Sequence, residues 1–194
     1  GPLLGGKFGM SLLSTAATTA AAFEALPETW STYVTQAKRY GHEANRKTWR
    51  LVGPIHIAET REKARENVKF GLQKWLHYFR HVGHLPLASA GEGSLENDIA
   101  AITDAGMAVI GTPDDLYHQI RRLNRQSGGF GVFLEMSHNW ADFPDTLRSY
   151  ELIARYVMPK FIHETNRQEE AYAWAMNKKP ALLEKRQEGI DRAI

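Results

Sequence analysis

Apolar residues along the chain occur in two arrangements, short unbroken runs and longer stretches with helical spacing. The short runs are typical of strands buried on both faces, and they occupy residues 7–14, 49–59 and 130–136. Stretches in which apolar residues recur every three or four positions predict amphipathic helices at 23–41, 61–82, 113–126 and 144–158. Strands and helices therefore alternate, which predicts an α/β fold with a parallel sheet.

Residues with known preferences for helix ends support these boundaries. Thr60 and Thr112 precede two of the helices as N-caps, and Asp115 stands where a capping box needs an acid. Gly41 and Pro159 follow two other helices in positions that favour termination. The periodic pattern breaks up near 83–104, so we expect a mobile loop there. Residues 161–194 are expected to form a polar, helical C-terminal tail.

The number of strands limits the architecture of residues 1–160. Three parallel strands separated by helices make either a small doubly wound sheet or part of a (β/α)₈ barrel. A complete barrel typically needs about 250 residues, and the chain has 194. We therefore expect at most a partial barrel.

Composition narrows the possible functions. The formal net charge of +2 is close to balance, so nucleic acid is not an expected partner. The absence of cysteine excludes disulfides, thiolate metal sites and a cysteine nucleophile. No apolar run approaches the roughly 20 residues that cross a bilayer, so we expect a cytoplasmic protein that does not bind a membrane.

Polar side chains lie at the end of each predicted strand. They are Ser14, Thr15, Thr18 and Thr19 at the first strand, His56 and Glu59 at the second, and Glu135, Ser137, His138, Asn139 and Trp140 at the third. Chemistry in α/β proteins gathers at the carboxyl edge of the sheet. The pattern therefore predicts one site at that edge, although each group also has a purely structural interpretation. Ser14 and Thr15 could cap a helix, His56 could be a core histidine bonded to a carbonyl, and 138–140 could be a turn whose Trp covers the core.

Two groups on the predicted helices have weaker functional interpretations. His77 and His81 are four residues apart, a spacing that can hold zinc, but no carboxylate lies near them in sequence and we expect no metal site. Arg121, Arg122 and Arg125 could meet phosphates, but a solvated helix face is the favoured interpretation.

Longer motifs in the chain carry a family resemblance. Residues 108–161, which include "GTPDD" and "SHNWAD", resemble the C-terminal signature of the luciferase-like flavin monooxygenases, in the branch of limonene monooxygenase. Residues 50–72 and 1–19 resemble the two preceding units of the same barrel. The resemblance implies the C-terminal part of a (β/α)₈ TIM barrel, with about three βα units and without the first half. Two open strand edges would then invite pairing with another copy or with the missing half.

The resemblance also implies a cofactor and roles for named residues. Reduced FMN, supplied by a flavin reductase or by NAD(P)H, would form a flavin peroxide with O₂ and insert one oxygen atom into a small apolar substrate. Gly1, Ser14, Thr15 and His56 would bind the flavin, with Gly1 ending a loop that holds its phosphate. His138 would be the catalytic proton donor, and Asn139 and Trp140 would contact the substrate.

Two alternative functions remain open from the sequence. One is a deazaflavin-dependent oxidoreductase of the same superfamily. The other is a catalytically silent half-barrel that acts as an oligomeric structural or binding module. With half of the flavin site absent, we expect this chain alone to bind FMN weakly and to have little activity.

Overall fold

The computed structural model describes residues 1–83, 94–136, 138–162 and 166–193. The chain divides into two compact units, Gly1–Val157 and Met158–Ile194. Ser137 and residues 84–93 of the expected loop lie outside the described residues.

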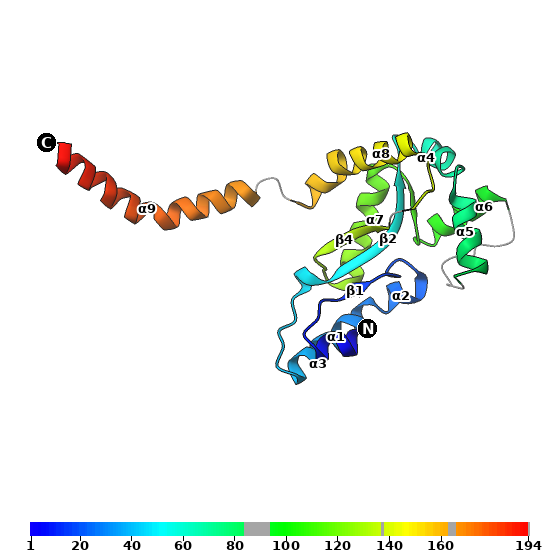
Figure 1. Cartoon of the computed structure of the whole chain (residues 1–194), viewed down its shortest axis with the longest axis horizontal. Coiled ribbons are helices and arrows are strands. Elements are labelled where there is room, and N and C mark those ends of the chain that lie inside the picture. The colour runs from blue at the N-terminus through cyan, green and yellow to red at the C-terminus, as the bar shows by residue number, and fades with distance from the viewer. Residues whose placement is uncertain (84–93, 137, 163–165, 194) are drawn as a thin grey trace. The chain divides into compact units, whose positions relative to one another are not determined.

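A parallel sheet organises the first unit, which confirms the predicted α/β class (Figure 1). Its strands are β1 Leu13–Ser14, β2 Arg50–Ile57, β3 Val109–Gly111 and β4 Val132–Met136. β2 pairs with each of the other three: Ser14 aligns with Leu51, His56 with Ile110 and Pro54 with Met136. The pairings of β1 with β2 and of β2 with β3 are consistent with part of a barrel, whereas β4 pairs with β2, two strands back in the chain.

Helices connect and follow the strands. They are α1 Pro2–Lys7, α2 Ala20–Glu24, α3 Leu26–Arg39, α4 Arg61–Val68, α5 Leu72–His81, α6 Leu95–Asp104, α7 Pro113–Ser127 and α8 Phe143–Leu152, with short turns at Arg46–Thr48, Ile153–Val157 and Met158–Lys160. The second unit contains α9 Asn166–Ala193. The predicted caps are confirmed: the side chains of Thr60 and Thr112 accept from the backbone N–H groups of Lys63 and Asp115, and Asp115 completes a capping box.

Several elements differ from the sequence prediction. The run at 7–14 is not one strand, because residues up to Lys7 belong to α1 and only Leu13–Ser14 pairs with β2. β3 was missed because three residues are too few to show a period. The predicted loop near 83–104 contains α6, whose cap is Ser94. The predicted helix 61–82 is two helices, separated around Gly71.

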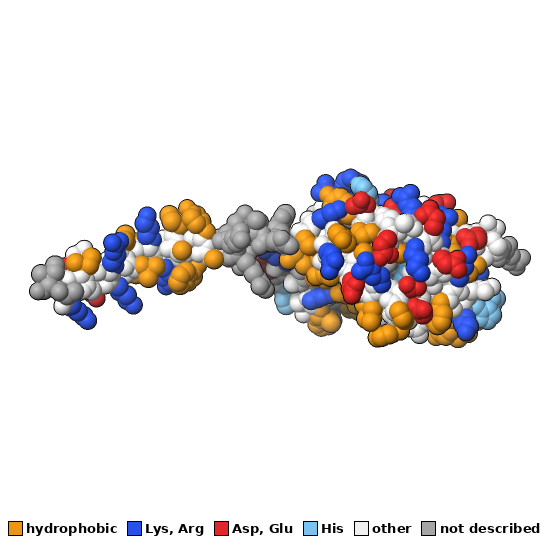
Figure 2. All heavy atoms as spheres, turned by 90° about the horizontal axis from the view of Figure 1, so that it is seen from above, with side chains coloured by type: hydrophobic (Ala, Val, Ile, Leu, Met, Phe, Trp, Pro, Cys, Tyr) orange, Lys and Arg blue, Asp and Glu red, His pale blue; other side chains and the backbone are white. Residues whose placement is uncertain are grey.

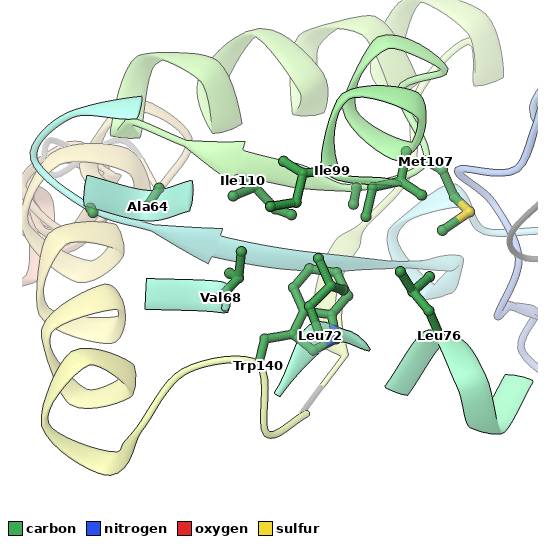
Figure 3. Packing of buried hydrophobic residues seen from close by; sticks show 11 residues of the cluster. Ala64, Val68, Leu72, Leu76, Ile99, Met107, Ile110 and Trp140 are labelled. Atoms are coloured by element: carbon green, nitrogen blue, oxygen red, sulfur yellow. The ribbon is translucent and has the colours of Figure 1, made fainter. Parts of the chain in front are cut away.

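Two apolar clusters form the core of the first unit. One joins Trp49 and Leu51 to residues of α3 and to Leu123 of α7. The other joins Ile110 to α4, α5, α6 and Trp140, as Figure 3 shows. Leu51 belongs to the first cluster, and His56 of the same strand aligns with Ile110 of the second cluster. Leu51 and His56 are five positions apart, and strand residues an odd number of positions apart point to opposite faces. The clusters therefore lie on opposite faces of β2.

The surface of the chain mixes charged and apolar side chains. Figure 2 shows Lys and Arg interspersed with Asp and Glu over one face of the first unit. In α9, the apolar side chains of Tyr172, Trp174 and Leu182 are more than half exposed, at 68%, 62% and 52%. Among the described residues, no helix has both the length and the hydropathy of a membrane span.

Candidate functional site

A buried polar cluster lies where β2 ends and the chain leaves β4. His56 is 2% exposed, and its Nε2 accepts from the side-chain amide of Asn67 of α4 at 3.2 Å. His138 follows β4, and its Nε2 donates to the backbone carbonyl of Ile55 at 3.0 Å. Both histidines therefore lie at the end of β2, because Ile55 precedes His56 in that strand.

Burial keeps both imidazoles neutral. It lowers the pKa of His56, with smaller opposing effects from nearby charges. It lowers the pKa of His138 to about 4, although the Ile55 carbonyl favours the charged form. Because a carbonyl only accepts, neutral His138 carries its proton on Nε2 and presents a lone pair at Nδ1. At neutral pH the free nitrogen of His138 is thus an acceptor, the reverse of the predicted proton donor.

Trp140 fixes His138 from within the core. Its indole is fully buried, stacks on the His138 ring at 3.8 Å and meets Trp75 edge-on at 5.2 Å. Its backbone carbonyl accepts from Gly71 N–H at 2.9 Å. The structure thus gives Trp140 the core position of the structural interpretation, whereas Asn139 is exposed.

Unsatisfied polar atoms are concentrated in this cluster. Three buried side-chain atoms of the described residues lack a hydrogen-bond partner: Asn67 Oδ1, His138 Nδ1 and Trp140 Nε1. They comprise one N–H donor and two acceptors. Polar side chains inside a protein normally have partners. The gathering of Asn67 and His138 with His56 at one end of β2 makes this cluster the candidate functional site.

The residues predicted from the first strand do not join this cluster. Ser14 accepts from the indole N–H of Trp49 at 3.1 Å and aligns with Leu51 at the beginning of β2. At about 3.3 Å per residue, that is roughly 16 Å from His56 along the strand. Gly1 and Thr15 are exposed. The prediction that all three strand ends lie at one edge is wrong for this strand, because β1 is two residues long and pairs with the beginning of β2, whereas His56 lies near the end of β2.

Asn67 of the cluster and Glu135, which lies on the opposite face of the sheet, were not assigned a role from the sequence. Asn67 lies beside Val68 and three residues after Ala64, and both of these are fully buried. A polar amide on the apolar face of a predicted helix could therefore have indicated a buried polar site from the sequence. Glu135 of β4 lies opposite Gly53, and burial raises the pKa of its carboxyl to about 7. A carboxylate between apolar neighbours in a strand was the corresponding signal.

The imidazoles of α5 form a separate pair. The rings of His77 and His81 lie 4.5 Å apart. Within the described ranges, no group of three His, Asp or Glu residues is placed to hold a metal ion.

Comparisons with known proteins identify the class. No protein-family model matches the chain. It is 40% identical over 177 residues to limonene 1,2-monooxygenase of Rhodococcus erythropolis, covering 91% of this chain and 45% of that protein. It is 29% identical over 146 residues to 4-hydroxyprotoasukamycin monooxygenase of Streptomyces nodosus subsp. asukaensis, covering 75% of this chain and 39% of that protein. The chain thus spans about half the length of the curated relatives it matches.

The fold has a solved counterpart. The structure is similar to the oxygenating constituent of 3,6-diketocamphane monooxygenase from Pseudomonas putida in complex with FMN, with a TM-score of 0.60 and 22% sequence identity over 82% of this chain and 45% of that one. That likeness establishes the shared α/β fold. The 40% identity over 91% of this chain confirms the resemblance: the chain belongs to the luciferase-like monooxygenases.

Proposed function

We propose that this chain is the C-terminal portion of a flavin-dependent monooxygenase that inserts one oxygen atom of O₂ into a small apolar organic substrate. The observation that carries the proposal is the 40% identity to limonene 1,2-monooxygenase over 91% of the chain. Reduced FMN, delivered by a reductase or formed with NAD(P)H, would supply the oxygen activation. The protein would bind, orient and desolvate the reactants.

The described residues do not form a flavin site by themselves. Ser14 lies beside the beginning of β2, whereas His56 lies at its end and is hydrogen-bonded to Asn67 on the side of α4. Gly1 and Thr15 are exposed. We therefore assign flavin binding to the complete protein, and we expect this chain alone to bind FMN weakly or not at all.

The cluster around His138 would serve the reaction at the substrate side. Nδ1 of neutral His138 would accept a hydrogen bond or a proton, and Trp140 would act as a positioning residue through the 3.8 Å stack. Exposed Asn139 would contact the substrate.

A fusion tests the proposal. The N-terminal part of the Rhodococcus erythropolis enzyme would be joined ahead of this chain and assayed for FMN retention and for transfer of isotopically labelled oxygen from O₂ to limonene. We expect the fusion to retain FMN and to transfer the label. The fusion carrying His138→Gln should have a lowered kcat and an altered pH profile of activity. His118→Gln, at an exposed position on α7, is the matched control.

A folded fusion that neither retains FMN nor transfers label would contradict the proposal. Hydride transfer from a reduced deazaflavin, without label, would instead favour the deazaflavin-dependent alternative.

A silent half-barrel that self-associates is a second candidate. It is favoured by exposed apolar side chains in and between α1 and β1: Leu4, Phe8 and Leu13 are 60%, 61% and 56% exposed. An inactive fusion and a stable oligomer of this chain, measured by light scattering after gel filtration, would support it.

A further inference from the structure

A groove separate from the buried cluster lies between α4, β3 and α7. Its volume is about 520 Å³, within the range of small-molecule sites. Charged side chains from α4, α6 and α7 line it: Arg61, Arg65, Asp104, Asp115, Arg122 and Arg125. The groove therefore combines a ligand-sized volume with an excess of positive charge.

One arginine of the groove is already neutralised. Arg61 donates through Nη2 to Asp115 Oδ1 at 2.6 Å and through Nε to Oδ2 at 3.0 Å. The same carboxylate accepts from Thr112 at the cap of α7. These bonds, with that from Arg61 the strongest, lower the pKa of Asp115 to about 2. Asp115 is thus committed to Arg61 and to the helix cap.

The other three arginines have no such partner. Among the described residues, no carboxylate lies within ion-pair distance of Arg65, Arg122 or Arg125. The remaining acid of the lining is Asp104, which is exposed. The lining therefore keeps a net positive charge, which Asp104 within it and Glu24 near Arg122 oppose only in part.

Arg122 is held in place before any ligand arrives. Its guanidinium lies 3.8 Å from the centre of the Phe23 ring, and burial lowers its pKa. It packs over Gly106, where φ is +65° and a Cβ would come within 2.7 Å of Nη1. A fixed and partly desolvated guanidinium loses little entropy when it binds an anion.

We propose that this groove binds a small molecule that carries a diphosphate group. Guanidinium groups match phosphate oxygens with paired hydrogen bonds. Arg122 and Arg125 are three residues apart on α7, so their Cβ atoms are about 5–6 Å apart on one face of the helix. Two linked phosphates can engage both at once, with Arg65 meeting them from α4. The site is independent of the flavin chemistry proposed above.

Calorimetry and phosphorus NMR on the chain test the proposal, with inorganic pyrophosphate as the probe. We expect binding that weakens roughly tenfold in Arg125→Gln, the loss of one charge-assisted contact, and further in Arg122→Gln/Arg125→Gln. Arg121→Gln is the matched control, because Arg121 is on the same helix and outside the groove lining. It should change the affinity less than twofold.

Comparison of ligands identifies the source of the diphosphate. ADP binding more tightly than pyrophosphate would indicate a nucleoside diphosphate, and equal affinities would indicate recognition of the diphosphate alone. Absence of pyrophosphate binding at millimolar concentration would overturn the proposal. Equal weakening in Arg121→Gln and Arg125→Gln, or none in the folded double variant, would overturn it too.

Discussion

Gly71 links α4 to α5, and its replacement by alanine gives a sharp test of how the polar cluster is built. The backbone of Gly71 has φ −142° and ψ −12°, a conformation that alanine can adopt. In open space, Gly71→Ala would then stabilise the fold by about 0.4–1 kcal/mol, because it restricts the unfolded chain. The sign of the effect depends on what surrounds the added methyl group.

The surroundings of Gly71 leave no room for a side chain. A Cβ would overlap the carbonyl oxygen of Asn139 and lie 2.9 Å from its carbonyl carbon. Both atoms are backbone, and the segment is also tied to Gly71 by the 2.9 Å bond from its N–H to the Trp140 carbonyl. Overpacking costs typically 1–3 kcal/mol, and loss of this bond adds about 1 kcal/mol. After subtraction of the entropic gain, we expect a net destabilisation of about 2 kcal/mol.

Urea unfolding followed by tryptophan fluorescence measures this difference. Near-ultraviolet circular dichroism should also change, because displacement of residues 138–140 disturbs the stack of His138 on Trp140. Gly83→Ala is the control: Gly83 follows the other end of α5, and its Cβ would meet Phe79 Cδ1 at an ordinary 3.4 Å. A Gly71→Ala protein as stable as the wild type, or more stable, would refute the packing argument.

Three further predictions concern ionisable groups. The pKa of His138 is lowered to about 4 in the folded state. The wild-type protein should therefore lose at most about 3 kcal/mol of unfolding free energy as pH falls from about 6.5 towards 4. Urea titrations at these two pH values should show a smaller loss in His138→Phe. The pKa of Glu135 is raised to about 7. The contribution of its protonated carboxyl to the free energy of unfolding is therefore present at low pH and lost as pH rises through 7. Near pH 8, Glu135→Gln should be more stable than the wild type by roughly 1 kcal/mol, a value discounted for partial exposure. Asp115→Asn should cost about 1–2 kcal/mol in thermal unfolding by weakening the capping box and the Arg61 pair, whereas Asp104→Asn should cost little.

The sequence predicted the fold best where the signal was local. β2 is continuous and apolar, and the caps at Thr60 and Thr112 follow from side-chain chemistry that needs no tertiary contact. β3 and β1 were out of reach for a physical reason: strands of three and two residues are specified by their pairing with β2. The spacing of Leu95, Ile99 and Ile102 did carry the signal of α6, but the polar residues around it hid the pattern.

The candidate site divides in the same way. The rule that strand ends of a parallel sheet share an edge placed His56 and His138 at one end of the sheet, where the structure has His138 bonded to the Ile55 carbonyl. The protonation of His138 could not be predicted, because it depends on burial by Trp140 and on a backbone acceptor from another strand. Ser14 was misplaced because the rule presumes strands that run in register from end to end.

The buried cluster is built from polar side chains at a place where apolar residues would serve the core. His56 and Asn67 are 2% and 7% exposed and are hydrogen-bonded to each other, and the His138 ring stacks on the fully buried Trp140. A hydrogen bond between buried polar groups contributes only about 0.5–1.5 kcal/mol of net stability, and replacement of both partners by apolar groups of the same shape is often nearly neutral. The stability of the fold therefore does not account for an amide and two imidazoles at the end of β2, whereas a role in binding or catalysis does.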